Sequence, residues 1–157
     1  MTNLAGVKAA FFSSRTRTVA YWGATVLVVG ELLLGGVWDI LLTPGGRETM
    51  TQLGYPAYFA VIMGVWKVPG AAALLAPRFP RLKEWAYAGA IFTYTGAAAS
   101  HLAVGQGAAT VVLPLIFVVL AAASWALRPP NRRDRTPRAG IYVEPTPRST
   151  PRRWART

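Results

Sequence analysis

Five side chains that could hold a polar ligand or relay protons lie within an otherwise apolar stretch of this sequence. They are Glu31, Asp39, Lys67, Tyr94 and His101. Carboxylates, an ammonium, a phenol and an imidazole can donate, accept or transfer protons, and ionisable groups in an apolar span are a functional hypothesis by default. What they do depends on the elements that bring them together.

The charges of the chain are concentrated at its two ends. The 157-residue sequence is 53% hydrophobic, yet its formal net charge is +11. Lys8, Arg15 and Arg17 precede the first apolar run, and nine arginines follow the last one. An almost uncharged middle between basic ends indicates an integral membrane protein. The sequence has no Cys, which excludes thiolate catalysis, iron–sulfur clusters and Cys-ligated zinc, and we expect no metal site.

Four windows are long and apolar enough to cross a bilayer. A hydrocarbon core of about 30 Å requires roughly 20 mostly apolar residues, and lipid offers the backbone no hydrogen-bond partners, so each span must be a helix. The windows are residues 19–42, 57–76, about 85–105 and 107–127. We therefore predict an all-α integral membrane fold, a bundle of four transmembrane helices within a domain of residues 19–127.

The positions of Lys and Arg predict the orientation. The N-terminal segment of residues 1–18 carries three, the loop around residues 76–84 three, and the segment of residues 128–157 nine. The first loop carries Arg47 alone, and the third loop none. Because basic residues accumulate on the cytoplasmic side, we predict that both termini are cytoplasmic.

The C-terminal segment, residues 128–157, is rich in Arg and Pro and has few apolar residues. Such a composition cannot bury enough surface to fold alone, so we predict a disordered tail. Its charges would bind anionic lipid head groups, at about 1 kcal/mol per basic residue near the surface. No folded nucleic-acid-binding module accompanies it, and we expect no specific nucleic-acid partner.

Glu31 and Lys67 are predicted to lie at matching depth on adjacent spans. At 1.5 Å per residue, Lys67 lies about 15 Å and Glu31 about 16 Å from the outer boundary. An unpaired charge in mid-helix costs roughly 2.5–3.5 kcal/mol on insertion scales, and pairing inside the bundle removes most of that cost. We predict an ion pair, which either belongs to a functional site or only fixes the register of the helices.

Asp39 and His101 are predicted to form a second polar layer, about one helical turn from the outer interface. Tyr94 precedes His101 by seven residues and shares its helical face. We therefore expect these three residues, with Glu31 and Lys67, to line one polar pocket in the outer half of the membrane. The alternative is that Asp39 and His101 are interfacial residues in contact with water.

Three segments of the sequence carry a combination of motifs. They contain Leu-Gly-Tyr-Pro, Lys-Val-Pro-Gly, Lys-Glu-Trp-Ala-Tyr-Ala-Gly and Ser-His, and they are residues 53–59, 66–92 and 95–105. Together they resemble the DoxX-like family of small bacterial four-helix membrane proteins, which is related to DoxX and DoxD. The resemblance covers roughly residues 19–127 and leaves the tail outside.

The resemblance implies a multi-pass protein of the bacterial plasma membrane. DoxX and DoxD are membrane subunits associated with quinone-linked oxidation, including thiosulfate:quinone oxidoreductase, and with oxidative-stress systems. On this basis we expect an accessory subunit with a quinone as the candidate cofactor and a redox subunit as its partner. Lys67 and His101 would hydrogen-bond a quinone carbonyl, and Tyr94 would lie beside the ring.

Two other functions stay open. The ionisable residues could serve a small transporter or proton relay, or the polar layer could only specify the fold of a structural or assembly protein. The chain has no Cys and a single His, and hence no redox-centre motif, so we do not expect it to be an enzyme on its own. The sequence leaves association with further copies of the chain open.

Overall fold

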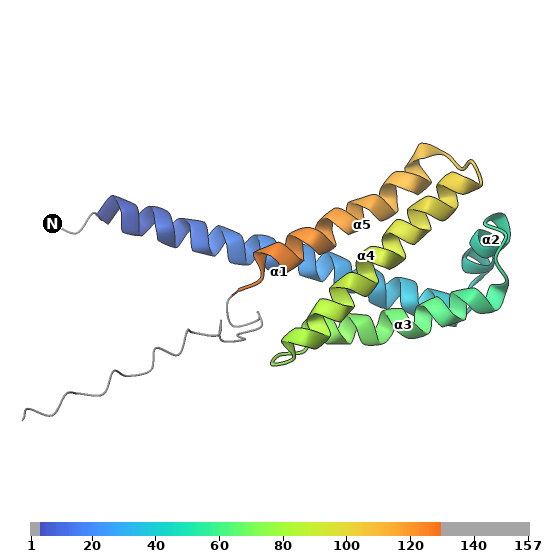
Figure 1. Ribbon diagram of the computed structural model, residues 1–157, viewed down its shortest axis with the longest axis horizontal. Helices are drawn as coiled ribbons and strands as arrows, with labels where there is room; N and C mark the ends of the chain where they lie inside the picture. Colours follow the sequence, from blue (N-terminus) through green and yellow to red (C-terminus); the bar gives the residue numbers. More distant parts are fainter. Residues whose placement is uncertain (1–3, 130–157) are drawn as a thin grey trace, which may run out of the picture.

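The computed structural model describes residues 4–129, with side chains from residue 15 onwards. This part of the chain forms five helices and no strand (Figure 1). Their bounds are α1, Leu4–Ile40; α2, Pro44–Gln52; α3, Ala57–Leu75; α4, Pro80–Ala103; and α5, Ala108–Leu127. The prediction of an all-α fold is therefore confirmed for these residues. The predicted disorder and lipid binding of the tail beyond residue 129 lie outside them.

Three helical segments are long and apolar enough to cross a membrane. They are Arg15–Ile40 within α1, Ala57–Leu75 and Ala108–Leu127. The helix α4 is not among them, because its apolar residues alternate with Thr, Tyr, Gly, Ser and His, which lower its mean hydropathy. The fourth span of the sequence analysis therefore stays a prediction.

Two features of the chain path differ from the sequence analysis. Helix α1 runs without a break from Leu4, since no proline interrupts residues 4–40. The stretch expected to be a loop, residues 43–56, contains the short helix α2. This helix begins with a typical N-cap. The backbone N–H of Gly46 donates to Oγ1 of Thr43 at 3.3 Å, and Pro44 occupies the first turn.

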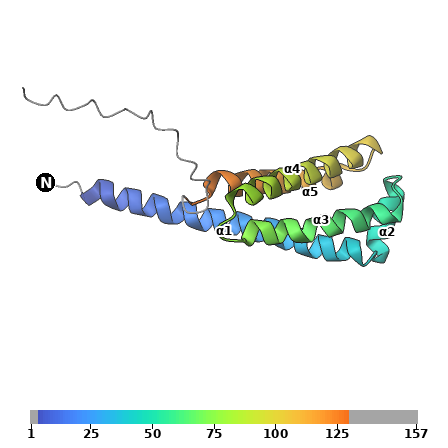
Figure 2. The ribbon, with the colours of Figure 1, turned by 60° about the horizontal axis from the view of Figure 1, so that its bottom comes forward.

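The long helices form two layers. Helix α1 packs against α3, and α4 packs against α5 as an antiparallel pair. The layers meet near the α3–α4 connection and diverge towards α2, so the molecule is open at the α2 end (Figures 1 and 2). The core lies where the layers meet, and its buried side chains are Val28, Val29, Leu32, Ala71, Leu74, Tyr87, Ala90, Tyr94 and Ala121.

Polar contacts close the end where the layers meet. Lys83 is 1% exposed, and its ammonium donates to the backbone oxygens of Ala73, at 3.2 Å, and of Leu74. These carbonyls belong to the last turn of α3, where helical partners are missing. Arg128 donates to Glu84 at 2.5 Å and ties the end of α5 to the start of α4. Lys83 thus joins the two layers, and Arg128 joins the two helices of one layer.

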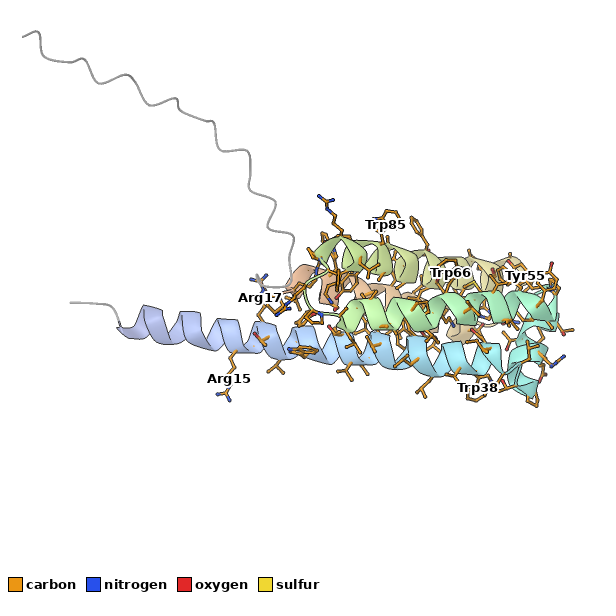
Figure 3. The ribbon with its side chains drawn as sticks, turned by 90° about the horizontal axis from the view of Figure 1, so that it is seen from below. Arg15, Arg17, Trp38, Tyr55, Trp66 and Trp85 are labelled. Carbon is orange, nitrogen blue, oxygen red and sulfur yellow. The ribbon has the colours of Figure 1, made fainter. Side chains whose placement is uncertain are left out.

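The outer surface of the helices is apolar. Trp66 on α3 and Trp85 on α4 are 74% and 80% exposed, and both project outwards from the helices (Figure 3). Leu34 on α1 and Phe92 on α4 are exposed to a similar degree. A water-soluble bundle would cover such faces with polar residues, whereas lipid solvates them. This surface is that of helices embedded in a bilayer.

Helices α1 and α3 approach each other most closely at two glycines. A Cβ atom on Gly64 of α3 would lie 2.5 Å from the backbone oxygen of Gly36 on α1. A Cβ atom on Gly36 would in turn lie 3.1 Å from the Cβ of Lys67. In a membrane, small residues at such crossings let helices pack by direct backbone contact. The two glycines thus bring Lys67 close to α1.

We expect Gly64→Ala to destabilise the protein by about 1–3 kcal/mol, because the backbone oxygen opposite cannot move without separating the helices. The thermal unfolding of purified protein in detergent measures the effect. Gly70→Ala in the same helix is the matched control, since a Cβ atom there meets nothing within 4 Å. Equal melting temperatures for the two variants would contradict the proposed close contact.

Candidate functional site

Lys67 pairs with two carboxylates of α1. Its Nζ lies 3.0 Å from Oδ2 of Asp39 and 3.5 Å from Oε1 of Glu31. The three side chains are 15%, 19% and 25% exposed, respectively. The predicted contact between Glu31 and Lys67 is confirmed. Asp39, which the sequence analysis placed in a second polar layer nearer the outer interface, also contacts Lys67, because the long lysine side chain reaches both carboxylates.

Gly35 provides the space for this ion cluster. It lies midway between Glu31 and Asp39, four residues from each, so all three share one face of α1. A Cβ atom on Gly35 would lie 2.8 Å from Oε1 of Glu31 and 3.2 Å from Nζ of Lys67. The ammonium therefore sits over a position without a side chain. The Glu–Gly–Asp spacing was the sequence signal for this arrangement.

Tyr94 of α4 completes the cluster. Its hydroxyl donates to Oε2 of Glu31, so the two oxygens of this carboxylate have different partners. The ring of Tyr94 stacks on Phe117 of α5, with centroids 5.4 Å apart. Residues of α1, α3 and α4 thus meet at one carboxylate, as the sequence analysis predicted for Glu31, Lys67 and Tyr94.

His101 lies in the last turn of α4 and has other partners. Its Nδ1 is 2.7 Å from Oε1 of Gln106, and Nε2 of Gln106 donates to Oε1 of Gln52 at 3.3 Å. This chain joins the α4–α5 connection to α2. Among the described residues, no hydrogen bond or ion pair links His101 directly to the Lys67 cluster.

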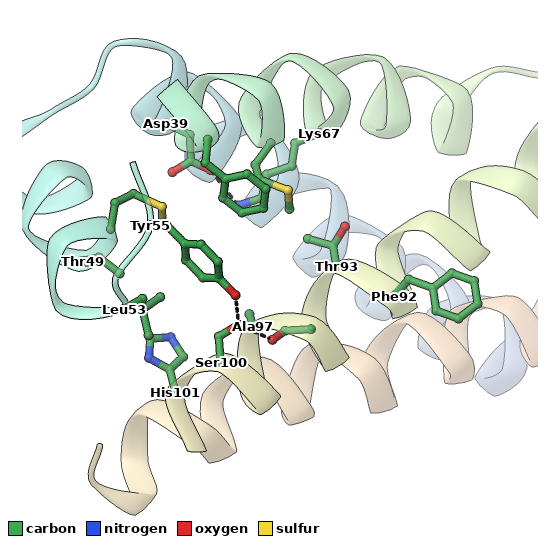
Figure 4. Close-up of a pocket in the computed structure, with 14 residues that line it drawn as sticks. Asp39, Thr49, Leu53, Tyr55, Lys67, Phe92, Thr93, Ala97, Ser100 and His101 are labelled. Carbon is green, nitrogen blue, oxygen red and sulfur yellow. Dashed lines mark hydrogen bonds and ion pairs between the residues drawn. The ribbon is translucent and has the colours of Figure 1, made fainter. Parts of the chain in front are cut away.

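A cavity of about 490 Å³ separates His101 from Lys67 (Figure 4). It lies between α2, α3 and α4; we call it the head cavity. Tyr55 projects into it, and its hydroxyl lies 3.0 Å from Oγ of Ser100 on the opposite wall. The lining residues are Asp39, Thr49, Met50, Leu53, Tyr55, Phe59, Met63, Lys67, Phe92, Thr93, Gly96, Ala97, Ser100 and His101.

A neighbouring cavity of about 300 Å³ extends the site towards α5. Glu31 and Tyr94 line it, and it shares Lys67 and His101 with the head cavity. The five residues of the sequence analysis therefore surround two adjoining cavities, although no direct bond joins all five.

The walls of the head cavity combine aromatic rings with polar groups. Tyr55 and Phe59 stack with centroids 4.9 Å apart. The ammonium of Lys67 supplies hydrogen-bond donors beside these rings, and the hydroxyl groups of Tyr55 and Ser100 bond to each other. In the described part of the chain, no group of three His, Cys, Asp or Glu side chains could hold a metal ion. The arrangement suits a small ring-shaped ligand that carries hydrogen-bond acceptors.

The sequence analysis missed the contribution of α2 and of Tyr55. Thr49 and Met50 of α2, with Leu53 directly after this helix, form one end of the head cavity. The Thr-Pro pair that begins this helix was the available signal. Tyr55 lies between α2 and α3, and only the three-dimensional structure shows that it faces Ser100.

We expect Lys67→Met to destabilise the protein, because two carboxylates would lose their counter-ion. Removal of one partner of a buried pair costs roughly 3–5 kcal/mol, and the partial exposure here places the cost at the lower end. The triple variant Glu31→Gln, Asp39→Asn, Lys67→Met has no charge to compensate and should recover most of the stability. Thermal unfolding in detergent compares them; a triple variant as unstable as Lys67→Met would refute the ion cluster.

The comparison with known proteins agrees with this architecture. The sequence matches the DoxX-like family over residues 23–124. The match begins within α1, ends within α5 and includes all the residues of the ion cluster together with His101. No curated protein and no solved structure matches the chain. The match covers well over half of the sequence, and the chain therefore belongs to the DoxX-like family.

Proposed function

We propose that this protein is an accessory membrane subunit that binds a quinone in the head cavity for a redox partner. The observation that carries the proposal is the position of Lys67, whose ammonium lines the cavity while two carboxylates hold it in place. An ammonium has three N–H donors. Asp39 accepts one of them at 3.0 Å, and Glu31 is an ion-pair partner at 3.5 Å, so the ammonium keeps a donor for a ligand.

The dimensions and chemistry of the head cavity support a quinone. A volume of about 490 Å³ lies within the usual range of small-molecule sites, roughly 300–1,000 Å³. Quinone carbonyls accept hydrogen bonds, and the ammonium of Lys67 lines the cavity as a donor. The hydroxyls of Tyr55 and Ser100, which bond to each other, add polar surface on another side of the cavity. Phe59 and Phe92 offer aromatic surface for the ring. His101 lies at the outer end of the same cavity, as a further polar group.

In this proposal the protein binds and orients the quinone, and the electrons come from a partner subunit. The chain has no Cys and one His, so its own side chains offer no redox centre. Redox chemistry of this kind belongs to the cofactor, while the protein supplies position and electrostatics. We therefore propose no catalytic role for the chain alone.

One observation favours a second function, a proton relay. A continuous series of polar contacts runs from Tyr94 through Glu31 and Lys67 to Asp39. Such series of ionisable groups carry protons in pumps and transporters. Proton flux into liposomes that contain the purified protein, abolished by Glu31→Gln, would favour the relay over quinone binding.

We propose that α4 is a fourth membrane span. It has 24 residues, and at 1.5 Å per residue it is about 36 Å long, enough to cross a hydrocarbon core of about 30 Å. It packs against α5 and α3, two candidate spans. With four spans, both termini lie on one side, and the distribution of Lys and Arg favours the cytoplasm of a bacterial cell.

The absence of Cys makes this topology directly testable. Thr51, Arg78 and Val104 are exposed residues of α2, of the α3–α4 connection and of the α4–α5 connection. A membrane-impermeant maleimide should label Thr51→Cys and Val104→Cys in cells whose plasma membrane is intact, and Arg78→Cys only after lysis. Labelling of Arg78→Cys and Val104→Cys from the same side would rule out α4 as a span.

We expect quinone to co-purify with the wild-type protein in mild detergent and to be lost from the charge-neutral triple variant Glu31→Gln, Asp39→Asn, Lys67→Met. Mass spectrometry of the lipid extract, relative to protein, measures it. The triple variant removes the ammonium without leaving unpaired carboxylates, so the loss would not reflect misfolding.

Lys83→Met is the matched control for the quinone experiment. It also removes a buried ammonium, but Lys83 lies at the other end of the molecule, where it binds the end of α3. We expect this variant to retain quinone even if its stability falls. Equal retention in the wild type and the triple variant would argue against a role of the ion cluster in binding.

A further inference from the structure

A second cavity, of about 460 Å³, lies between α3 and α4 on the side of Lys67 that faces the α3–α4 connection. We call it the side groove. Apart from Lys67 and Thr93, its lining is formed by apolar, aromatic and glycine residues. The lining residues are Leu32, Met63, Trp66, Lys67, Pro69, Gly70, Ala73, Leu82, Trp85, Ala86, Gly89, Ala90 and Thr93.

The side groove is continuous with the head cavity. Met63, Lys67 and Thr93 line both. On one side of these residues are the hydroxyls of Tyr55 and Ser100. On the other side the walls are apolar, and no charged residue other than Lys67 lines the groove. The site therefore changes from polar to apolar at Lys67.

Small residues keep the side groove open. Gly70 on α3 and Gly89 on α4 form part of opposite walls, and a Cβ atom on either would meet nothing within 4 Å. Leu32 of α1, which is 3% exposed, closes the inner side. Trp66 and Trp85 project outwards beside the groove (Figure 3). A slender apolar chain could therefore enter from the lipid.

We propose that the side groove binds the apolar tail of the quinone whose ring occupies the head cavity, so that the ligand class is a quinone with a polyprenyl or long alkyl tail. This inference rests on the proposed function. From Thr93 to Leu82 the groove follows α4 for about 16 Å, roughly half of the hydrocarbon thickness. The tail leaves the ring at Lys67 and runs along α4 towards the α3–α4 connection.

Shape, and not the hydrophobic effect, must select the tail. The surrounding lipid is as apolar as the groove, so moving the tail from lipid into the groove gains no hydrophobic free energy. The gain comes only from van der Waals contacts, which are closer with the groove wall than with fluid acyl chains. The glycine positions are therefore the sensitive points. A Cβ atom at position 89 meets nothing within 4 Å, and Gly89 does not line the head cavity, so we expect a leucine there to occupy the groove and leave the head cavity unchanged.

The test uses wild-type protein and the Gly89→Leu variant in lipid nanodiscs, with empty nanodiscs as the blank. Two benzoquinone probes have the same ring, one with a ten-carbon alkyl tail and one with a methyl group in its place. After correction for partition into lipid, we expect the wild type to bind the tailed probe about tenfold more tightly. In Gly89→Leu this advantage should vanish, while the affinity for the tail-less probe stays the same.

Gly30→Leu is the matched control, because a Cβ atom on Gly30 also meets nothing within 4 Å and the residue lines neither cavity. It should retain the tenfold preference. Gly70→Leu, on the opposite wall, replaces Gly89→Leu if the latter does not fold.

Each result of this test has a defined meaning. If both Gly89→Leu and Gly70→Leu kept the preference for the tailed probe, the tail site would be overturned, and the groove would be filled by lipid acyl chains. Equal wild-type affinity for the two probes would also overturn it, while the proposed quinone site in the head cavity would stand. If the wild type bound neither probe, the proposed function itself would fail, and the tail site with it.

Discussion

The structure depends on one ammonium held between two carboxylates in an apolar environment. Lys67 is tolerable at this depth only because Asp39 and Glu31 lie within 3.0 and 3.5 Å of its Nζ. That geometry requires α1 and α3 to be in contact, which Gly36 and Gly64 permit. The ion cluster therefore sets the register of two helices, and the same register exposes the ammonium to the cavity. The structural role of Lys67 and the binding role proposed for it thus follow from one arrangement.

The two ends of the molecule are built differently, and this difference produces the cavity. Near the α3–α4 connection the layers are joined by the apolar core and by Lys83 on the last carbonyls of α3, and the contact between Arg128 and Glu84 fastens α5 to α4 within one layer. At the α2 end, contacts between the layers are single polar bonds, such as that of Tyr55 with Ser100. Helix α2 occupies the opening between them and forms one end of the head cavity. A structure that is closed at one end and spread at the other offers space for a ligand without loss of its core.

Much of this arrangement could be predicted from the sequence, and the missing parts have physical causes. Counting residues along two helices gave equal depth for Glu31 and Lys67, because helix rise is constant. The same count did not predict the contact of Asp39 with Lys67, because it cannot describe how far a lysine side chain extends. Helix α2 was missed because it is short and polar, as a loop is. In the sequence, only the capping residue Thr43 marks its start. The partner of His101 was not predictable, since Gln106 and Gln52 meet only after the layers are assembled.

The charge of the cluster also restricts which ligand the head cavity can accept. With both carboxylates ionised, Glu31, Asp39 and Lys67 together carry one net negative charge. An anionic ligand would therefore gain little from Lys67, because two nearer oxygens already compensate the ammonium. A neutral molecule with carbonyl oxygens meets no such repulsion and can still accept the remaining N–H of Lys67. Electrostatics thus favour a neutral acceptor over a carboxylate or phosphate, and a quinone in its oxidised form is a ligand of that kind.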